Sequence, residues 1–273
     1  MSYALVTGAA KGIGAAIAIE LAKLKKGLIL VDVDERSLHE VAQYIQDKYY
    51  VDVFPIVQDL SQPDAAQQIF EKTKWYHLYL NIVVNNAGFG LNIPFTEGSL
   101  DDQLNIIDVN VKAQLRIVHT FVPVLKRFSE SYLLNVGSTT CYQSVPYLSV
   151  YAASKAFVRS FTRSLRYELK DSTVSVSCLI PGPTDTAFVE RAGMKTHTLK
   201  TAAKFNMTPQ EVAQVAVKGL FKGKAEIVPG FINKLNAVVT KFVPPRIVEH
   251  VAAQIYKPRP GEQEDKKAVA LQY

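Results

Sequence analysis

The chain has 273 residues, 48% of them hydrophobic, enough for one large α/β domain or at most two small ones. Basic residues exceed acidic ones by 31 − 25 = 6, but they are scattered, so we expect no nucleic-acid binding. The two cysteines, Cys141 and Cys178, have neither disulfide nor metal spacing. We therefore expect a cytoplasmic protein that has no metal site, no targeting segment and no transmembrane segment.

Short runs of β-branched or aliphatic residues alternate with helical stretches along the chain. This rhythm predicts an α/β fold: a single Rossmann-like, doubly wound parallel sheet with helices on both faces, in the strand order 3-2-1-4-5-6 with a seventh strand. Pro55 removes a ladder donor from the third run, which favours an edge position for that strand. The runs lie at residues 4–6, 28–31, 51–57, 82–84, 133–136 and 174–180.

The chain shows no internal repeat and no interdomain linker. We expect one dinucleotide-binding and catalytic domain at 1–256, which includes a substrate lid at 188–207 and a helical extension at 231–256. The tail at 257–273, with prolines, a glycine and many charges, is expected to be disordered. Four helix starts show a hydroxyl followed three residues later by an acid, which is the capping-box pattern. These pairs are Ser37 with Glu40, Ser61 with Asp64, Ser99 with Asp102 and Thr208 with Glu211.

A glycine-rich turn with Gly8, Gly12 and Gly14 joins the first strand to the first helix. Backbone N–H groups and the positive helix end can bind a dinucleotide pyrophosphate there, and glycines permit the tight turn and close approach. Taken alone, the motif also fits an ordinary glycine-rich turn. With Thr7 before it, the spacing G-x-x-x-G-x-G resembles that of the short-chain dehydrogenase/reductase family.

Two residues near this turn bear on cofactor choice. Asp32 ends the second strand, where a carboxylate can accept hydrogen bonds from a ribose diol and would repel a 2′-phosphate. Lys11 favours the opposite choice, since the resemblance implies that a basic residue there often accompanies NADP. The repulsion between a carboxylate and a 2′-phosphate is stronger than the attraction of an exposed lysine for that phosphate. We therefore expect NAD(H) to be favoured and NADP(H) to be possible.

Three further stretches resemble signatures of this family, in the family's order. Residues 59–60 look like its adenine-contacting pair, residues 85–88 like its N-N-A-G signature, and residues 181–186 like its P-G-x-x-x-T turn at the nicotinamide carboxamide. In that turn, Thr184 replaces a residue that is often aliphatic. The resemblance implies cofactor binding by Gly8, Lys11, Gly12, Ile13, Gly14, Asp32, Asp59, Leu60, Asn86, Ala87, Gly88, Tyr151, Lys155, Pro181, Gly182, Thr184 and Thr186.

The candidate catalytic residues are Ser138, Tyr151 and Lys155. Ser138 follows the fifth run, and Tyr151 begins a helical stretch 151 − 138 = 13 residues later, so both can face one crevice. Tyr151 and Lys155 share a helix face at spacing i, i+4, and a nearby ammonium lowers the pKa of a tyrosine. A second Y-x-x-x-K pattern, Tyr44 with Lys48, has no serine thirteen residues before it.

The resemblance implies a role for each of these residues. Ser138 and Tyr151 would bind the substrate oxygen, Tyr151 would exchange a proton with it, and the nicotinamide would exchange a hydride. Lys155 would hold the cofactor ribose and tune Tyr151. Asn110, in a long helical stretch where asparagine is otherwise just a solvated residue, would hold a water that relays protons to Lys155.

An oxidoreductase acting on a carbonyl or alcohol is therefore the predicted function. Ser138 lacks the G-x-S-x-G context of a hydrolase nucleophile, and the histidines have no metal spacing. A nucleotide-binding regulatory or scaffold protein of the same fold is the alternative, although it predicts damage to the catalytic residues and all four are present. The resemblance implies a homodimer or homotetramer.

The C-terminal extension carries an apolar helical stripe that Pro244-Pro245 ends. Packing on the domain or on a second subunit is the expectation; a wall for an apolar substrate and a membrane-surface contact aided by Lys234 and Lys241 are the alternatives. The overall pattern is similar to ketoacyl reductases, which favours a 3-oxoacyl or another hydrophobic ketone as substrate. The stripe comprises Phe231, Ile232, Leu235, Val238, Val239, Phe242 and Val243.

Overall fold

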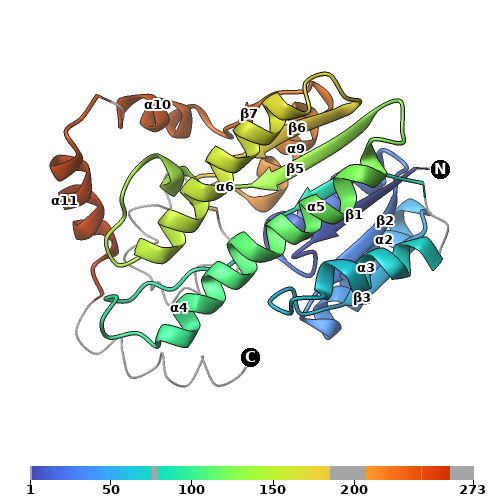
Figure 1. Cartoon of the computed structure of the whole chain (residues 1–273), viewed down its shortest axis with the longest axis horizontal. Helices are drawn as coiled ribbons and strands as arrows, with labels where there is room; N and C mark the ends of the chain where they lie inside the picture. The colour runs from blue at the N-terminus through green and yellow to red at the C-terminus, as the bar shows by residue number, and fades with distance from the viewer. Residues whose placement is uncertain (1, 76–78, 185–206, 241, 259–273) are drawn as a thin grey trace.

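The computed structural model describes residues 2–75, 79–184, 207–240 and 242–258. Its centre is a parallel sheet in the order β3-β2-β1-β4-β5-β6-β7 (Figure 1). The predicted fold class and strand order, with the seventh strand, are confirmed. The strands are β1 Tyr3–Thr7, β2 Gly27–Asp32, β3 Val53–Val57, β4 Leu80–Asn85, β5 Ser131–Val136, β6 Val174–Leu179 and β7 Glu226–Ile227.

Helices cover both faces of this sheet (Figure 1). They are α1 Gly12–Lys23, α2 Glu35–Tyr49, α3 Ala65–Trp75, α4 Leu100–Ile107, α5 Gln114–Leu125, α6 Ser149–Glu168, α9 Pro209–Phe221, α10 Phe231–Val239 and α11 Pro245–Tyr256. Side chains alternate along a strand, so Ala4 and Val6 of β1 pack in one core with α1, α2 and α9. Leu5 packs in the opposite core with α3 and α5. Both faces are covered, which explains the nearly continuous apolar strands.

Two of the four predicted helix starts are confirmed. Thr208 caps α9 with a complete capping box formed with Glu211, and Pro209 follows as the first helical residue. Ser99 caps α4 by accepting a hydrogen bond from Asp102 N (3.4 Å). In both cases the hydroxyl satisfies a backbone N–H group of the first helical turn.

The other two predicted starts are wrong. Helix α2 has Asp34 as its N-cap, because the Asp34 carboxylate accepts hydrogen bonds from both the backbone N–H and the hydroxyl of Ser37. Ser61 lies in a turn before α3, where its N–H donates to the Asp59 carboxylate (2.9 Å). In each case an earlier carboxylate, that of Asp34 or Asp59, accepts a hydrogen bond from the backbone N–H of the serine, so the serine is not the helix cap.

The edge position predicted for the third run is confirmed. Among the described strands, β3 is at the edge of the sheet and pairs only with β2, where Pro55 lies opposite Leu30. The missing N–H of a proline costs no ladder bond on the outer side of such a strand.

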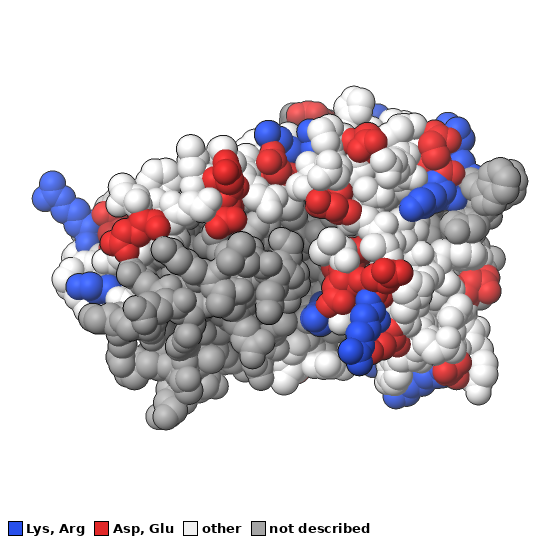
Figure 2. Space-filling view, turned by 90° about the horizontal axis from the view of Figure 1, so that it is seen from below, with Lys and Arg blue, Asp and Glu red and all other residues white. Residues whose placement is uncertain are grey.

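The predicted lid at 188–207, apart from Met207, lies outside the described residues, as does the predicted tail beyond Pro258. Thr184 and Met207 form a parallel bridge, so the residues that flank 185–206 lie side by side. None of the described helices is long and apolar enough to cross a membrane. On the face shown in Figure 2, the described acidic and basic side chains are interspersed rather than separated by sign.

Candidate active site

The segments with predicted site residues follow the carboxyl ends of five strands. The glycine turn follows β1, Asp32 ends β2, the N-N-A-G loop extends from β4, Ser138 comes shortly after β5, and Pro181 comes shortly after β6. In a parallel sheet these ends meet at one edge, and the order β2-β1-β4-β5-β6 places the five segments beside one another. The topology therefore gathers these segments into one region.

The turn after β1 has a backbone conformation that requires glycine at several positions. Gly8 and Gly12 have φ values of 63° and 60°, in the left-handed region. A Cβ at Gly14 would lie 2.0 Å from Gly8 O, so this position has no room for a side chain. The N-cap residue of α1 makes no side-chain cap hydrogen bond, and no acidic residue lies in the first turn of the helix. A dinucleotide pyrophosphate fits such a helix start.

Asp32 closes this turn from the end of β2. Its carboxylate accepts hydrogen bonds from Ala10 N (2.9 Å), Val33 N (2.8 Å) and Asp34 N (3.1 Å). These contacts fix the carboxylate beside the glycine turn. Asp32 thus acts as a strand-end turn residue and also lies in the position that the cofactor prediction requires.

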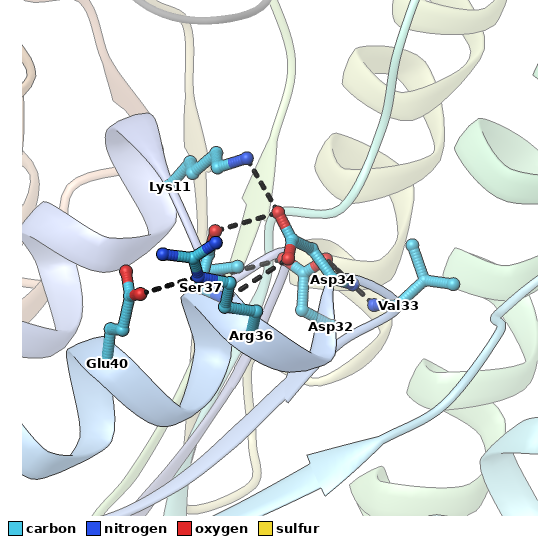
Figure 3. A network of polar contacts seen from close by, with 8 residues as sticks. Lys11, Asp32, Val33, Asp34, Arg36, Ser37 and Glu40 are labelled. Atoms are coloured by element: carbon cyan, nitrogen blue, oxygen red, sulfur yellow. Dashed lines mark hydrogen bonds and ion pairs between the residues drawn. The ribbon is translucent and has the colours of Figure 1, made fainter. Parts of the chain in front are cut away.

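Lys11 and Asp34 form an ion pair of 2.6 Å in front of Asp32 (Figure 3). A hydrogen bond from Lys11 is the largest influence on Asp34 and brings the pKa of its carboxyl to about 2. The positive charge of Lys11 therefore lies against a carboxylate at this end of the site. Asp34 was missed in the sequence because its contact with Lys11 joins separate turns.

The loop after β4 is tied to the glycine turn. Thr7 Oγ1 accepts from the backbone N–H of both Asn86 (3.0 Å) and Ala87 (3.1 Å). The Asn86 side chain donates to the carbonyls of Thr7 and Gly8, each at 3.0 Å. The role of Thr7 in the structure is thus to join two of the predicted cofactor-binding segments.

Asp59 and Leu60, the predicted adenine-contacting pair after β3, both make contacts within the protein. The Asp59 carboxylate accepts from Ser61 N and from the Gln62 amide (3.2 Å), both in its own turn. Although burial opposes ionisation, the hydrogen bonds from Ser61 and Gln62 hold the pKa of Asp59 below its usual value. Leu60 is buried in the core that includes Ile56. Asp59 and Leu60 therefore both contribute to the structure of the turn after β3.

Two glycines bring the loop after β4 against the catalytic candidates. A Cβ at Gly88 would lie 2.9 Å from Asn110 Oδ1 and 3.2 Å from Lys155 Nζ. A Cβ at Gly90, which the sequence motifs did not single out, would lie 2.8 Å from the Tyr151 ring. Both positions need glycine for close approach, and they show that this loop, Asn110, Tyr151 and Lys155 are neighbours.

Asn110 lies in a π-helical turn, Asp108–Ala113, rather than in the regular helix that was expected. Its side-chain amide accepts from Phe89 N (3.0 Å) and donates to Phe89 O (2.9 Å) and Ser154 Oγ (3.0 Å). All these bonds are buried. The side chain therefore joins the loop after β4 to helix α6, and π-helical turns are frequent at functional sites.

Ser138 and Tyr151 form the buried polar pair of the site. Ser138 caps a 3-10 helix, Thr139–Tyr142, by accepting from Thr140 N (3.2 Å). Burial raises the pKa of Tyr151, and a hydrogen bond with Ser138 acts in the opposite direction. Burial has the larger effect, and Lys155 Nζ lies 5.8 Å from the Tyr151 ring centre, so the lowering of this pKa by Lys155 stays a prediction.

Lys155 is buried, and its Nζ donates to Val136 O (2.9 Å) at the end of β5. Burial disfavours the ammonium and lowers the pKa of Lys155 to about 8. By contrast, the second Y-x-x-x-K pair is exposed on α2, with Lys48 Nζ only 2.7 Å from Tyr44 Oη. Close contact therefore does not distinguish the two pairs, whereas burial among site residues does.

In the turn after β6, the hydroxyl of Thr184 donates to Gly182 O (3.0 Å). Pro181 O accepts from Thr139 N (2.9 Å), which links this turn to the Ser138 loop. A Cβ at Gly182 would lie 2.3 Å from the Asn233 side chain, so α10 packs directly on the turn. Thr186 lies outside the described residues.

Helix α11 also reaches the site. Tyr256 O accepts from the Asn92 side chain (2.9 Å), and Tyr256 packs with Ala252 against Leu148 and Ala152 of the Tyr151 region. Tyr256 has no motif around it, so its place could not be predicted. Among the described residues, no group of His, Cys, Asp or Glu could hold a metal ion.

A helix start beside a glycine turn, next to a buried Ser, Tyr, Lys and Asn set, defines a dinucleotide-dependent oxidoreductase of the Rossmann class. The model of the short chain dehydrogenase family matches residues 2–197. The chain belongs to this family, whose members are NAD(P)-dependent enzymes acting on CH–OH and C=O groups. The predicted family and enzyme class are confirmed.

Several curated proteins are similar. A Staphylococcus saprophyticus protein named as an uncharacterized oxidoreductase is 32% identical over 80% of this chain and 90% of its own length. The NADP-dependent 3-hydroxy acid dehydrogenase of Schizosaccharomyces pombe is 29% identical over 79% of this chain and 85% of its own. The human inactive hydroxysteroid dehydrogenase-like protein 1 is 35% identical over 66% of this chain but 54% of its own.

Solved structures share the fold. A short-chain dehydrogenase from Sphingobium yanoikuyae in complex with NADPH has a TM-score of 0.79 at 24% identity, over 96% of this chain and 97% of its own. One from Burkholderia phymatum in complex with NAD has a TM-score of 0.80 at 22% identity, over 89% of this chain and 96% of its own.

Proposed function

We propose that this oxidoreductase interconverts a secondary alcohol and a ketone, with Tyr151 as the general acid and base and NAD(H) as the preferred cofactor. The observation that carries the proposal is that Tyr151, Lys155 and Asn110 are buried together beside the loop after β4. When bound, the nicotinamide supplies or accepts the hydride.

The roles of the chain's own residues follow from their contacts. Tyr151 and Ser138 bind the substrate oxygen, and Tyr151 donates a proton to it during reduction and removes one during oxidation. Burial raises the pKa of Tyr151, so this residue is a protonated donor before reduction. Lys155 supplies a nearby positive charge that favours the phenolate form left after proton donation.

Asn110 is proposed to support proton relay toward Lys155, with its main chain rather than its side chain holding the relaying water. Its side-chain oxygen accepts from Phe89 N, and its side-chain nitrogen donates to Phe89 O and Ser154 Oγ. With these bonds made, the side chain positions the loop and helix, while a relaying water is held by the main chain of the π-helical turn.

The NAD preference is supported by charge. Asp32 and Asp34 lie together beside the glycine turn, and Lys11 is paired with Asp34 at 2.6 Å. A 2′-phosphate there would meet two carboxylates and a cation that is already neutralised. The proposed cofactor sites are those predicted from the glycine turn, Asp32, the 59–60 pair, the N-N-A-G loop and the turn after β6.

For the substrate we propose a hydrophobic or 3-oxoacyl-type ketone. Ala252 and Tyr256 of α11 pack with Leu148 and Ala152, so the surroundings of Tyr151 on this side are apolar. We also propose a homodimer or homotetramer in the cytoplasm, and the two free cysteines are consistent with a reducing compartment.

A nucleotide-binding protein with little turnover is the second candidate. It is favoured by the similarity to a relative that is named inactive. The presence of Asn110, Ser138, Tyr151 and Lys155 in one buried cluster supports the enzyme instead.

The test begins with titration of the purified protein by NADH and NADPH, followed by cofactor fluorescence, and then a panel of hydrophobic and polar ketones. We expect tighter NADH binding and turnover of bulky or acyl ketones. Tyr151→Phe should lower turnover by orders of magnitude and leave cofactor binding largely intact. The matched control is Tyr44→Phe, which changes the exposed Y-x-x-x-K pair. Tight binding without turnover of any ketone would favour the second candidate.

A further inference from the structure

The outward side chains of α10 and α11 are unusually apolar. Of the 21 exposed large hydrophobic residues among the described part of the chain, nine fall between residues 231 and 255. We call these nine the C-terminal apolar face. They are Phe231, Ile232, Leu235, Val238, Val239, Phe242, Ile247, Val251 and Ile255. Exposed apolar residues gathered in this way mark an interaction surface.

In a typical surface helix the large apolar residues face the core, but in α10 and α11 they face solvent. Only Ala237 of α10 and Ala252 of α11 are buried, whereas Phe231 is 79% exposed. In α11 the exposed residues Ile247, Val251 and Ile255 recur every four positions, which places them along one side of the helix. Asn233 of α10 and Ala252 and Tyr256 of α11 thus contact the domain, whereas the side chains of the C-terminal apolar face point to solvent.

The charge of this segment indicates the partner. Residues 231–257 contain the basic residues Lys234, Lys241, Arg246 and Lys257 and one acid, Glu249, a net charge of 4 − 1 = +3. The whole chain has a net charge of +6, so a tenth of the residues carries half of the excess. Lys234, Arg246 and Lys257 are exposed.

We propose that the C-terminal apolar face binds the surface of an anionic lipid membrane. Apolar side chains would enter the interface between headgroups and acyl chains while the basic residues contact anionic headgroups. A symmetric contact with a second copy would instead bring two segments of charge +3 together, which is electrostatically unfavourable. Both helices stand at one end of the molecule, away from the edge strand β3 (Figure 1).

The same helices adjoin the active site, through Asn233 on Gly182 and through Tyr256 on Asn92. A membrane bound at the C-terminal apolar face would therefore lie near the proposed site for a hydrophobic ketone. This last step depends on the proposed function, whereas the membrane contact does not.

The test is flotation of the full chain with vesicles of phosphatidylcholine alone and of phosphatidylcholine with one quarter phosphatidylserine. We expect binding to the anionic vesicles, and at least tenfold weaker binding by the double variant Phe231→Ser/Phe242→Ser. Lys234→Gln with Arg246→Gln should weaken binding to anionic vesicles by about fivefold for each cation. The matched control is Tyr50→Asn, directly after α2, because Tyr50 and Phe242 are both 83% exposed.

Three results would overturn the proposal. The first is a wild-type chain that floats with neither vesicle, and the second is a phenylalanine double variant that binds as well as the wild type. The third is a smaller mass of that variant in vesicle-free sedimentation, which would identify a second copy as the occupant. Turnover of a short water-soluble ketone without vesicles should be unchanged in the double variant, so failure of membrane binding is distinguishable from failure of the proposed reaction.

Discussion

The Asn110 side chain donates a hydrogen bond to Ser154 Oγ (3.0 Å), and Ser154 Oγ donates to the carbonyl of Tyr151 (2.7 Å). Asn110 also holds Phe89 in the loop after β4 through two bonds. One buried amide therefore connects the helix that carries Tyr151 with the loop that passes Lys155.

Asn110→Ala should destabilise the protein and reduce turnover. The substitution removes three buried hydrogen bonds, which Asn110 makes with Phe89 N–H, Phe89 C=O and the Ser154 hydroxyl. Their loss should lower the free energy of unfolding by roughly 3 kcal/mol or more. Urea unfolding and kcat measure the two effects. Ser154→Ala is the control, since it removes the bond from Asn110 and the bond to Tyr151 O but leaves both bonds between Asn110 and Phe89 in place. An Asn110→Ala protein as stable as wild type would contradict the contacts described here.

Lys155→Met should be more stable than wild type at pH 7, although inactive. Burial lowers the pKa of Lys155 to about 8, compared with 10.5 in the unfolded chain. A lowered lysine pKa means that the folded state binds fewer protons between these pH values, so wild-type stability rises with pH across this window. Below pH 8 the burial penalty is fully present, roughly 3 kcal/mol, and the lost bond to Val136 offsets part of it.

The measurement is urea unfolding of both proteins at pH 7 and pH 10.5. The stability difference should favour Lys155→Met at pH 7 and shrink toward pH 10.5. Comparison of the two proteins at each pH cancels the titration of all other groups. A difference that stays constant with pH would show that Lys155 does not titrate in this window. Higher stability with lost function is expected where a charge is buried for catalysis.

Local patterns in the sequence were sufficient for the parts of the fold that local physics determines. The strand order followed from the βαβ rhythm, and the edge position of β3 followed from Pro55. The glycine turn was predictable because its positive φ values at Gly8 and Gly12 restrict those positions to very few residue types.

Contacts between distant segments could not be read from the sequence. The pairing of Lys11 with Asp34 joins two turns, and the π-helical geometry around Asn110 has no residue signature. The apolar stripe was expected to pack on the domain or on a second subunit. Packing on the domain is wrong for the large side chains of α10, which face solvent, and packing on a second subunit stays a prediction. Periodicity identifies an apolar helix face without indicating the direction in which that face points.

Asp34→Asn should shift cofactor preference toward NADPH. The substitution removes one carboxylate from the Asp32 region and, with it, the 2.6 Å ion pair that neutralises Lys11. Lys11 is 55% exposed, so solvent screening limits the gain to about tenfold in the ratio of NADPH to NADH affinity. Asparagine remains a good N-cap, so the stability of α2 should change little.

Fluorescence titration with both cofactors measures this ratio. The control is Glu40→Gln, which breaks the pair between Arg36 and Glu40 on the same helix without touching Lys11. An unchanged ratio in Asp34→Asn would leave Asp32 alone responsible for any NAD preference.

Glu226→Gln should weaken the contacts that hold the 3-10 helix after Ser138 to α6 and β7. Glu226 in β7 lies 2.9 Å from Arg159 and 2.8 Å from Arg163 of α6, and it accepts from the Tyr142 hydroxyl (3.2 Å) in the 3-10 helix after Ser138. Arg159 also stacks over the Tyr142 ring at 4.7 Å. Loss of the charge should cost about 1 kcal/mol at pH 7, since Arg163 is 55% exposed.

The pH dependence distinguishes this charge effect from a packing defect. Burial opposes ionisation of Glu226, but hydrogen bonding and the charges of the two arginines hold its pKa below the usual 4.5. A lowered carboxyl pKa gives stability that is present above pH 4.5 and is lost as the pH falls through the folded-state value. The stability difference between wild type and Glu226→Gln, measured by urea unfolding, should therefore be full at pH 7 and diminish below pH 4.5. A difference that is equal at pH 7 and in acid would show that the glutamine disturbs packing and that the charge of Glu226 contributes nothing.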